Sequence, residues 1–207
     1  MFEPFEERVK AKGFKRIAGV DEAGRGPLAG PVIAASVIFK DSLCPQNPLF
    51  FQINDSKKIS SKKRELIYEY LTSSPDVEFA ISRVDPDEID DINILQASLK
   101  AMKMAVAQHS PPPDYLLIDG NQLFVDNIAK EAVVQGDARV LSIAAASIIA
   151  KVVRDRIMEG YHQEYPQYDF LGHKGYPTKK HREAIERYGL SPIHRKSFRV
   201  KLLCQEV

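Results

Sequence analysis

The amino-acid sequence predicts an α/β domain in which helices flank a central mixed sheet, with a basic helical extension at the C-terminus. Two observations predict this fold class. Strand-like runs come first and then alternate with helical segments, and roughly the last 50 residues contain helices and loops but no clear strand. Because 207 residues with 44% apolar composition suffice for one core, we expect a single domain over residues 1–207, of which about 160–207 form a basic helical subdomain.

Five runs of apolar residues predict strands. A turn rich in glycine and proline joins the first two runs, and the third run alternates apolar with polar side chains. The last two runs are short and apolar, which is typical of buried strands. The predicted strands are residues 15–23, 31–39, 76–84, 115–119 and 132–137.

Four segments have the spacing of helices. A serine precedes the first, where its side chain can cap the helix N-terminus, and three prolines at 111–113 close the second. The third is rich in small residues that allow close packing, and Gly189 ends the fourth. The predicted helices are residues 60–74, 85–110, 142–165 and 178–189.

Composition bears on location and on binding partners. No apolar run is long enough to cross a membrane, the N-terminus lacks the apolar block of a signal peptide, and Cys44 and Cys204 lack metal-binding spacing, so we expect a reduced, cytoplasmic protein. Residues 1–150 contain 17 Lys and Arg against 21 Asp and Glu, whereas residues 151–201 contain 12 against 6. This asymmetry fits either a solvated helix face or a surface for a polyanion.

Carboxylates end three of the predicted strands. Asp21 and Glu22 close the first strand before a turn of small residues, Asp119 ends the fourth strand beside a glycine, and Asp137 follows another apolar run. A lone acidic pair at a strand end is more often solvated than functional. If neighbouring strands end at the same edge of one sheet, however, these carboxylates converge.

Convergent carboxylates repel one another and raise one another's pKa unless a cation is present. Oxygen ligands without nearby His or Cys select Mg²⁺ or Mn²⁺ over Zn²⁺, and two such ions about 4 Å apart can hold the attacking and leaving oxygens of a phosphoryl displacement. The sequence therefore predicts a two-metal site. Asp155 is a further candidate, but it lies between two arginines within a predicted helix, so we expect a local ion pair there.

Two further segments suit phosphate. The turn at Gly24, Arg25 and Gly26 does not fit a dinucleotide-binding loop, because a proline interrupts it and a β-branched run follows. Its glycines would let the backbone approach a ligand closely, and its arginine could meet a phosphate, although an ordinary tight turn is the alternative. Lys57 and Lys58 precede a serine-capped helix, where a phosphate site and a solvated charge run are both open.

The segment GHKGYPTKKH places a tyrosine in a Gly-Pro loop among cationic side chains. A rigid aromatic ring among cations suits stacking against a sugar or base, whereas the alternative is a tyrosine that closes the core beneath a loop. The segment HRKSFRV extends the same basic stretch. The candidate substrate-binding residues in these two segments are Lys174, Tyr176, His194 and Arg195.

Six segments, in order along the chain, resemble motifs of the bacterial ribonuclease HII family. They are GVDEAGRGPLAGPV, NDSKKIS, LIDGN, AAASIIAKVVRDR, HKGYPT and HRKSF. Any one of them is a weak match, but six collinear segments over nearly the whole chain are specific. The resemblance implies a ribonuclease H-like fold and a metal-dependent endonuclease, which cuts RNA within RNA–DNA hybrids and at single ribonucleotides embedded in duplex DNA.

The resemblance also implies the site residues. The family's four metal-binding acids fall on Asp21, Glu22, Asp119 and Asp137. The last assignment rests on QGDARV, which resembles the family's Lys-Gly-Asp-Ser segment although Gln135 and Ala138 differ from it. The family's Gly-Arg-Gly element falls on Gly24, Arg25 and Gly26, and its ribonucleotide-sensing tyrosine falls on Tyr176.

The predicted reaction is hydrolysis 5′ to the ribonucleotide with two Mg²⁺ or Mn²⁺ ions, leaving 3′-hydroxyl and 5′-phosphate ends. The partners would be RNA–DNA hybrid and ribonucleotide-containing duplex DNA, bound through phosphates without reading sequence. The segment KLLCQEV lacks the paired aromatic residues of a sliding-clamp motif, so we expect no protein partner and a monomer. Two alternatives stay open, namely another ribonuclease H-like DNA nuclease of the resolvase or integrase type, and a non-enzymatic nucleic-acid-binding module.

Overall fold

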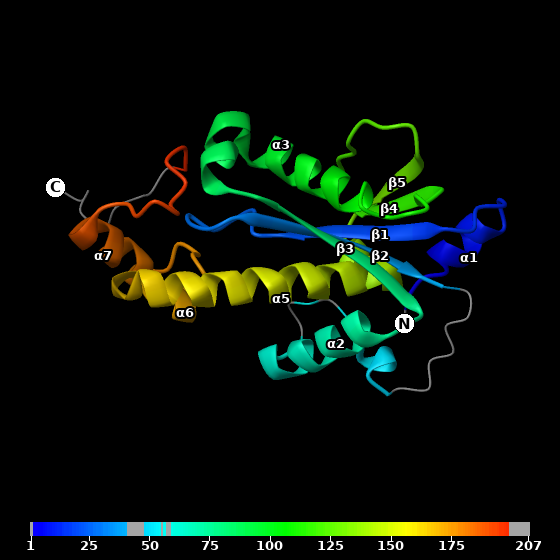
Figure 1. Cartoon of the computed structure of the whole chain (residues 1–207), viewed down its shortest axis with the longest axis horizontal. Coiled ribbons are helices and arrows are strands. Elements are labelled where there is room, and N and C mark those ends of the chain that lie inside the picture. Colours follow the sequence, from blue (N-terminus) through cyan, green and yellow to red (C-terminus); the bar gives the residue numbers. More distant parts are fainter. Residues whose placement is uncertain (1, 41–47, 55, 57–58, 199–207) are drawn as a thin grey trace.

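The computed structural model describes residues 2–40, 48–54, 56 and 59–198, and it places a five-stranded sheet between helices (Figure 1). The strands are β1 (Ile17–Ala23), β2 (Val32–Phe39), β3 (Val77–Val84), β4 (Tyr115–Asp119) and β5 (Ala129–Val133). The α-helices are α1 (Phe5–Lys10), α2 (Ser61–Ser73), α3 (Pro86–Val106), α4 (Gly136–Arg139), α5 (Leu141–Glu164), α6 (Phe170–His173) and α7 (Lys179–Tyr188). The short 3₁₀ helices are η1 (Phe50–Gln52) and η2 (Pro166–Tyr168).

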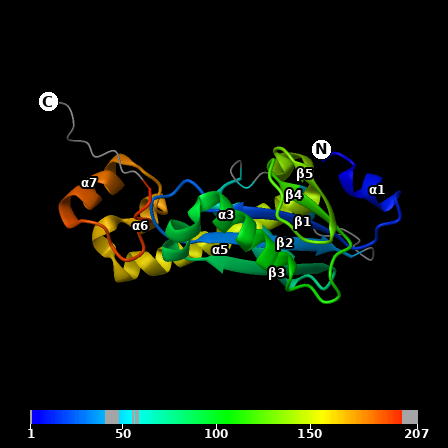
Figure 2. The ribbon, with the colours of Figure 1, turned by 90° about the horizontal axis from the view of Figure 1, so that it is seen from above.

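The sheet is mixed and flanked by helices, which confirms the predicted fold class. Its order is β3-β2-β1-β4-β5, with β1 antiparallel to β2 and parallel to β4, while β2 is antiparallel to β3 and β4 is parallel to β5. α3 lies over one face and α5 over the other (Figures 1 and 2). Because both faces are covered, the central strands β1, β2 and β4 are buried on both sides, which explains their nearly continuous apolar sequence.

The close contact between α5 and β1 places this helix beside the strand end that carries Asp21. A Cβ atom on Gly19 would lie 2.3 Å from the carbonyl carbon of Ser142, so glycine is needed for the first turn of α5 to approach β1. The alanines at 144–146 are fully buried on the same helix, as the predicted close packing requires. The following turns of α5 therefore run alongside the carboxyl end of β1.

The strand predicted at 132–137 is wrong in its bounds. β5 ends at Val133, Gln135 has a left-handed backbone conformation with φ of 56°, and α4 begins at Gly136. β5 is an edge strand whose side chains are mostly exposed or half-buried. The apolar residues after Val133 would therefore gain little burial by pairing as a strand, and the chain turns into α4 instead.

The helix predicted at 85–110 is shorter and kinked. α3 ends at Val106, and Asn93 interrupts it with a φ of 65°. The Asn93 side-chain oxygen accepts hydrogen bonds from the backbone N–H groups of Leu95 (3.0 Å) and Gln96 (3.2 Å), so it caps the second part of the helix. With a ψ of 163°, this backbone lies outside the left-handed helical region and is strained, so the two hydrogen bonds help to hold it.

The other three predicted helices are confirmed as α2, α5 and α7. The predicted serine cap of α2 is Ser60, whose side-chain oxygen accepts a hydrogen bond from the N–H of Lys63 (3.3 Å). As predicted, α7 stops at a glycine: its last residue is Tyr188, and Gly189, with a positive φ of 75°, follows it. These boundaries follow from local signals, because caps and terminal glycines act within one helical turn.

The segments from η2 to α7 pack against the C-terminal half of α5 and the chain that follows β1. The rings of Tyr168 and Phe170 stack with centroids 5.4 Å apart. They share a buried apolar cluster with Leu28, which follows β1, and with Met158 of α5. This cluster joins the C-terminal helices to the turn of small residues after Glu22.

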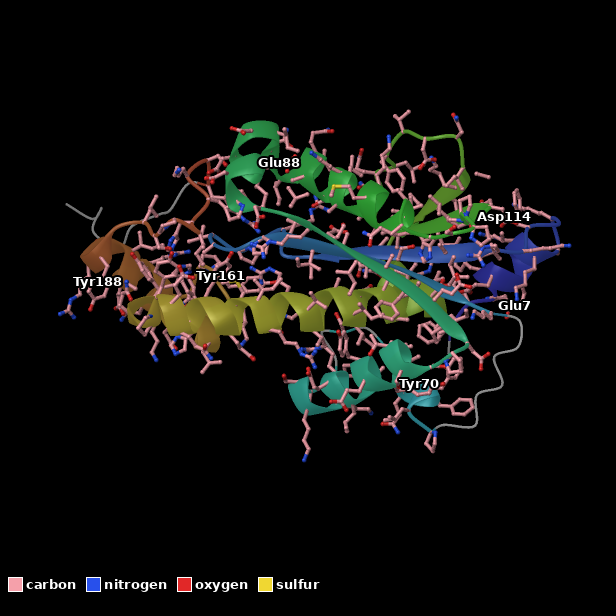
Figure 3. The ribbon with its side chains drawn as sticks, in the orientation of Figure 1. Glu7, Tyr70, Glu88, Asp114, Tyr161 and Tyr188 are labelled. Atoms are coloured by element: carbon pink, nitrogen blue, oxygen red, sulfur yellow. The ribbon has the colours of Figure 1, made fainter. Side chains whose placement is uncertain are left out.

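The molecule is elongated, with α1 and α7 at opposite ends, as the labelled Glu7 and Tyr188 show (Figure 3). α1 was not predicted, and it packs Phe5 into the same buried cluster as Tyr115 of β4. Within the described residues, no helix is both long enough and apolar enough to cross a bilayer. The cytoplasmic location stays a prediction, as does the division of one domain into a core and a subdomain at about 160–207.

Candidate active site

Asp21 and Glu22 lie at the carboxyl end of β1. Asp21 is 5% exposed, and its carboxylate accepts hydrogen bonds from the Ser147 hydroxyl on α5 and from the backbone N–H of Glu22 (2.7 Å). The Glu22 carboxylate accepts a hydrogen bond from the Arg25 guanidinium (3.4 Å). Both acids are therefore held in place by neighbours on the strand, the turn and α5.

Asp119 ends β4, the parallel neighbour of β1, so it lies at the same edge of the sheet as Asp21. Its Oδ1 atom accepts hydrogen bonds from the backbone N–H groups of Gly136 (2.7 Å) and Asp137 (3.4 Å), which begin α4. Asp137 is 6% exposed and lies in the first turn of α4, not at the end of a strand as expected. The tertiary structure nevertheless brings Asp137 next to Asp119.

Burial and mutual repulsion raise the pKa values of the two adjacent acids. The pKa of Asp21 lies well above its usual value, chiefly because the carboxyl is buried and then because Glu22 and Asp119 are nearby negative charges. Burial also raises the pKa of Glu22, and the Arg25 guanidinium partly opposes that shift. A cation bound among these carboxylates would relieve both effects.

A cavity of about 280 Å³ joins the acids to the turn of small residues and to Tyr176. Its lining consists of Asp21, Glu22, Ala23, Gly24, Arg25, Gly26, Ser56, Asp119, Ser147, Lys151, Arg154 and Tyr176. A Cβ atom on Gly26 would lie 3.7 Å from Cε1 of Tyr176, so the turn and the ring are neighbours across the cavity. Tyr176 is 42% exposed, so its ring is open to a ligand and does not close the core beneath its loop.

Four polar lining residues were not singled out from the sequence as site residues, and three of them lie on α5. Ser147, Lys151 and Arg154 have the i, i+4, i+7 spacing of one helix face. That polar spacing within an otherwise apolar segment is the signal that could have identified them. The fourth, Ser56, shares a hydrogen bond with Ser147 (2.9 Å), which ties the preceding loop to α5.

Asp155 forms the local ion pair that we expected, although with different partners. Its carboxylate contacts the Lys151 ammonium (2.7 Å) and the Arg64 guanidinium (3.6 Å), and not the arginines that flank it in sequence. Burial lowers the pKa of Lys151, and Asp155 opposes that shift. The pair holds the Lys151 ammonium 5.9 Å from the ring centroid of Tyr176.

Three candidate substrate-binding residues do not line the cavity. Lys174 forms an ion pair with Glu159 (2.9 Å), and His194 and Arg195 are each only 1% exposed. Because a buried side chain cannot reach a phosphate in solution, the prediction of direct substrate contact is corrected for His194 and Arg195. The other two candidates, Lys57 and Lys58, lie outside the described residues.

His194 belongs to a hydrogen-bonded chain of neutral imidazoles that ends at Tyr176. The Ser191 N–H donates to Nδ1 of His194 (2.9 Å), so the His194 proton lies on Nε2 and is donated to Nε2 of His181 (3.0 Å). Nδ1–H of His181 then donates to the carbonyl oxygen of Tyr176 (2.9 Å). Burial lowers the pKa of both imidazoles to about 4, which keeps them neutral at pH 7.

The acids fit a divalent-metal site by their chemistry. Within the described part of the chain, no three Asp, Glu, His or Cys side chains already converge as a complete metal-binding group. Three carboxylates nevertheless line one cavity, and burial together with their proximity raises the pKa of Asp21 and Glu22. All the donors are carboxylate oxygens, the ligands that suit Mg²⁺ and Mn²⁺.

Comparison with known proteins shows the family of the chain. The Ribonuclease HII of Syntrophus aciditrophicus (strain SB) is 50% identical over 197 residues, which cover 95% of this chain and 90% of that protein. The family profile described as Ribonuclease HII matches residues 18–201. The chain belongs to the ribonuclease HII family. The protein is therefore an enzyme of the ribonuclease H type.

Two solved structures share its fold. The PCNA:RNase HII complex from Archaeoglobus fulgidus matches with a TM-score of 0.75 and 22% identity, covering 90% of this chain and 96% of that chain. Bst-RNase HIII in complex with Mn²⁺ matches with a TM-score of 0.61 and 18% identity, covering 84% of this chain and 63% of that chain. At these identities the likeness shows the fold alone. The absence of a protein partner for this chain stays a prediction, because the segment 201–207 on which it rested lies outside the described residues.

Proposed function

We propose that this protein hydrolyses the RNA strand of RNA–DNA hybrids and cuts 5′ to single ribonucleotides embedded in duplex DNA, leaving 3′-hydroxyl and 5′-phosphate ends. The observation that carries the proposal is one cavity in which buried carboxylates lie beside the Gly24–Gly26 turn and Tyr176. Family membership supports the hybrid as the class of substrate. An acidic cavity alone would suit many nucleases, whereas the turn and the ring add a means of recognising ribose.

Four acids would hold two Mg²⁺ or Mn²⁺ ions. They are Asp21, Glu22, Asp119 and Asp137. The chemistry that bound ions supply is activation of the attacking water and stabilisation of the leaving 3′ oxygen. The protein keeps the ligands oriented, because Ser147 and the Glu22 N–H hold Asp21 while the N–H groups at the start of α4 hold Asp119. Such preorganisation avoids rearrangement of the ligands during the reaction.

The turn would recognise the 2′-hydroxyl through its backbone. This hydroxyl is the group that distinguishes a ribonucleotide from its deoxyribonucleotide neighbours. The N–H groups of Arg25 and Gly26 donate to no other described residue, and both residues line the cavity. A deoxyribonucleotide would leave such donors unpaired once water is excluded, which disfavours it. Tyr176 would pack against the adjoining deoxyribose.

Phosphate binding would come from cations around the cavity. Lys151 lines it directly, and the side chains of Lys179 and Lys180 on α7 are 79% and 80% exposed. Lys57 and Lys58, which lie outside the described residues, remain proposed phosphate ligands. These contacts carry no base information, so affinity should be independent of sequence and should fall steeply with salt.

The test compares three labelled duplexes of one sequence: all DNA, DNA with a single ribonucleotide, and RNA paired with DNA. Each is incubated with Mg²⁺, with Mn²⁺ or with chelator, and Asp21→Asn serves as the blank. We expect metal-dependent cleavage 5′ to the single ribonucleotide and within the RNA strand, with the all-DNA duplex intact. Cleavage of the all-DNA duplex would instead indicate a DNA nuclease, and binding without cleavage would indicate a non-enzymatic module.

A further inference from the structure

Two arginines lie beneath the Gly24–Gly26 turn without an acidic partner. Arg154 of α5 and Arg195, which follows α7, are each 1% exposed. No ion pair among the described residues includes either guanidinium. Burial lowers the pKa of both, and the nearby Arg154 charge contributes to the shift of Arg195. Burial of two positive charges without acidic partners lowers the stability of the fold. The hydrogen bonds of the two guanidinium groups indicate what this burial achieves.

Arg195 bonds the turn from the inside. Its guanidinium donates to the backbone carbonyl oxygens of Gly24 (2.6 Å), Arg25 (3.1 Å), Pro27 (2.8 Å) and Gly30 (2.8 and 3.0 Å). Its own backbone N–H donates to the carbonyl oxygen of Leu28 (2.8 Å). One side chain and its amide therefore hold most of the carbonyl groups of this turn toward the protein interior.

Arg154 joins the same turn to the loop that carries Tyr176. Its guanidinium donates to the carbonyl oxygens of Ala29 (3.0 Å), Pro31 (3.1 Å) and Lys174 (3.0 Å). A Cβ atom on Gly24 would lie 2.4 Å from Nε of Arg154, so the turn packs directly on this side chain. Arg154 thus bonds both walls of the cavity, the turn on one side and the tyrosine loop on the other.

These bonds determine where the turn directs its N–H groups. The peptide bonds of the turn are trans, and in a planar trans peptide the C=O and N–H groups point in opposite directions. The carbonyl of Gly24 faces Arg195, so the N–H of Arg25 faces away from it. The carbonyl of Arg25 faces the same guanidinium, so the N–H of Gly26 also faces away from it.

We propose that Arg154 and Arg195 are positioning residues that set ribonucleotide selectivity. They hold carbonyl groups on both sides of Gly26 inward and thereby keep the Arg25 and Gly26 N–H groups directed at the cavity, at a fixed separation from Tyr176. The choice of a ribonucleotide as substrate rests on the proposed function, whereas the claim that the two arginines hold the turn does not.

Lysine substitutions distinguish positioning from simple charge. Arg154→Lys and Arg195→Lys keep the positive charge, but one ammonium cannot reproduce the planar fork that reaches several carbonyl groups at once. The first readout is amide hydrogen exchange within residues 24–31 at Leu28 and Gly30, whose N–H groups donate to the carbonyl oxygens of Gly175 and Ile193, compared with exchange in β1 and α5. The second is the single-turnover cleavage rate at saturating enzyme on the single-ribonucleotide duplex, and the third is the affinity for the all-DNA duplex.

We expect each lysine variant to exchange faster at 24–31 while β1 and α5 stay protected. The saturating cleavage rate should fall by about tenfold to a hundredfold, since displacement of a positioning group by about 1 Å can cost that much. Affinity for the all-DNA duplex should change by less than about twofold, because charge and phosphate contacts are kept. Arg156→Lys is the matched control, since Arg156 lies on the same helix and pairs with Glu65 at the surface.

Several outcomes would overturn the proposal. Wild-type exchange at 24–31 in both lysine variants would show that the turn does not depend on these bonds. Faster exchange throughout β1 and α5 would show general stabilisation in place of positioning, and an unchanged cleavage rate would show that the position of the turn does not matter. If the wild-type enzyme itself fails to cut at a single ribonucleotide, the proposed function fails, while the exchange measurement still decides whether the arginines hold the turn.

Discussion

At the scale of single residues, Asp21 lowers the stability of the metal-free fold, and it is also a proposed metal ligand. Its carboxyl is buried against α5, beside Glu22 and near Asp119, and these surroundings raise its pKa well above the usual value. Without a cation, the charged form destabilises the fold. With a cation bound, the same burial strengthens the electrostatic interaction, because the local dielectric is low.

Replacing this residue should separate stability from activity. Asp21→Asn removes a buried charge and its repulsion with Glu22, so we expect an unchanged or higher melting temperature in metal-free buffer. Cleavage should fall at least about a hundredfold, since loss even of groups that orient metal ligands costs about 10–100-fold. Thermal unfolding and single-turnover cleavage measure the two effects. Asp91→Asn, at an exposed position on α3, is the control, and a large loss of stability in Asp21→Asn would contradict the prediction.

Gly24 allows a second residue-scale prediction because Gly13 provides a matched control. Both have a positive φ, +106° and +96°, but a Cβ atom meets nothing within 4 Å at Gly13 and lies 2.4 Å from Arg154 Nε at Gly24. Gly13→Ala should cost only the strain of the backbone, about 1–2 kcal/mol. Gly24→Ala should cost more in the free energy of unfolding and should lower cleavage at least about tenfold. Equal effects in urea unfolding and in cleavage would refute the proposed contact.

At the scale of elements, α5 brings the separate parts of the site together. Its first turn packs against Gly19 of β1, its middle supplies Ser147 and Lys151 to the cavity, and Arg154 bonds the turn after β1. The segments around α6 and α7 hold the opposite wall through the histidine chain that ends at the Tyr176 carbonyl. The site therefore depends on the packing of these elements as well as on its acids.

The histidine chain predicts how stability varies with pH. The folded pKa values of His181 and His194 are about 4, below the usual 6.5. Between about pH 6.5 and 4 the unfolded chain binds more protons at these sites than the folded chain does, so the free energy of unfolding should decrease as the pH falls. Because one pKa unit corresponds to about 1.4 kcal/mol, we expect a decrease of the order of a few kcal/mol.

Urea unfolding at several pH values measures this decrease. The Asp21→Asn background is appropriate, because the raised pKa of Asp21 acts in the opposite direction and stabilises the folded chain as the pH falls. Adding His181→Asn should make the pH dependence shallower. The same pH dependence with and without His181 would show that this chain of imidazoles does not control acid stability.

At the scale of the whole molecule, charge is distributed along the long axis. The basic excess lies in residues 151–201, and α7 lies at the end of the molecule opposite α1 (Figure 1). The cavity lies between these ends, at the carboxyl ends of β1 and β4. A duplex in the cavity could therefore extend along the basic end, where its phosphates would contact α7.

Salt dependence tests this arrangement. Affinity of the Asp21→Asn protein for a hybrid duplex should decrease linearly in a plot of log affinity against log salt concentration. Replacing both Lys179 and Lys180 with alanine should reduce the magnitude of that slope by about 2, since each phosphate contact contributes about 1. Lys12→Ala, at an exposed position beyond α1, should leave the slope unchanged. Equal slopes for all three proteins would place the duplex elsewhere.

Local sequence patterns were sufficient to predict the features that depend on neighbouring residues. Apolar runs identified β1 to β4 and the long helices, and caps or glycines identified the ends of α2 and α7. They also indicated that Asp21 and Asp119 end strands, because each follows an apolar run directly. These properties are local, since they depend on backbone geometry over a few residues.

Tertiary contacts determine which polar side chains line the cavity and which are buried beside it. His194 and Arg195 look like surface cations in the sequence, yet Arg195 bonds Gly24, 171 residues earlier in the chain. Asp137 reaches the acids through α4 and not through a strand, because the exposed edge strand β5 stops before it. Burial and hydrogen-bond partners arise from contacts between distant segments, and local sequence patterns carry no information about which segments will meet.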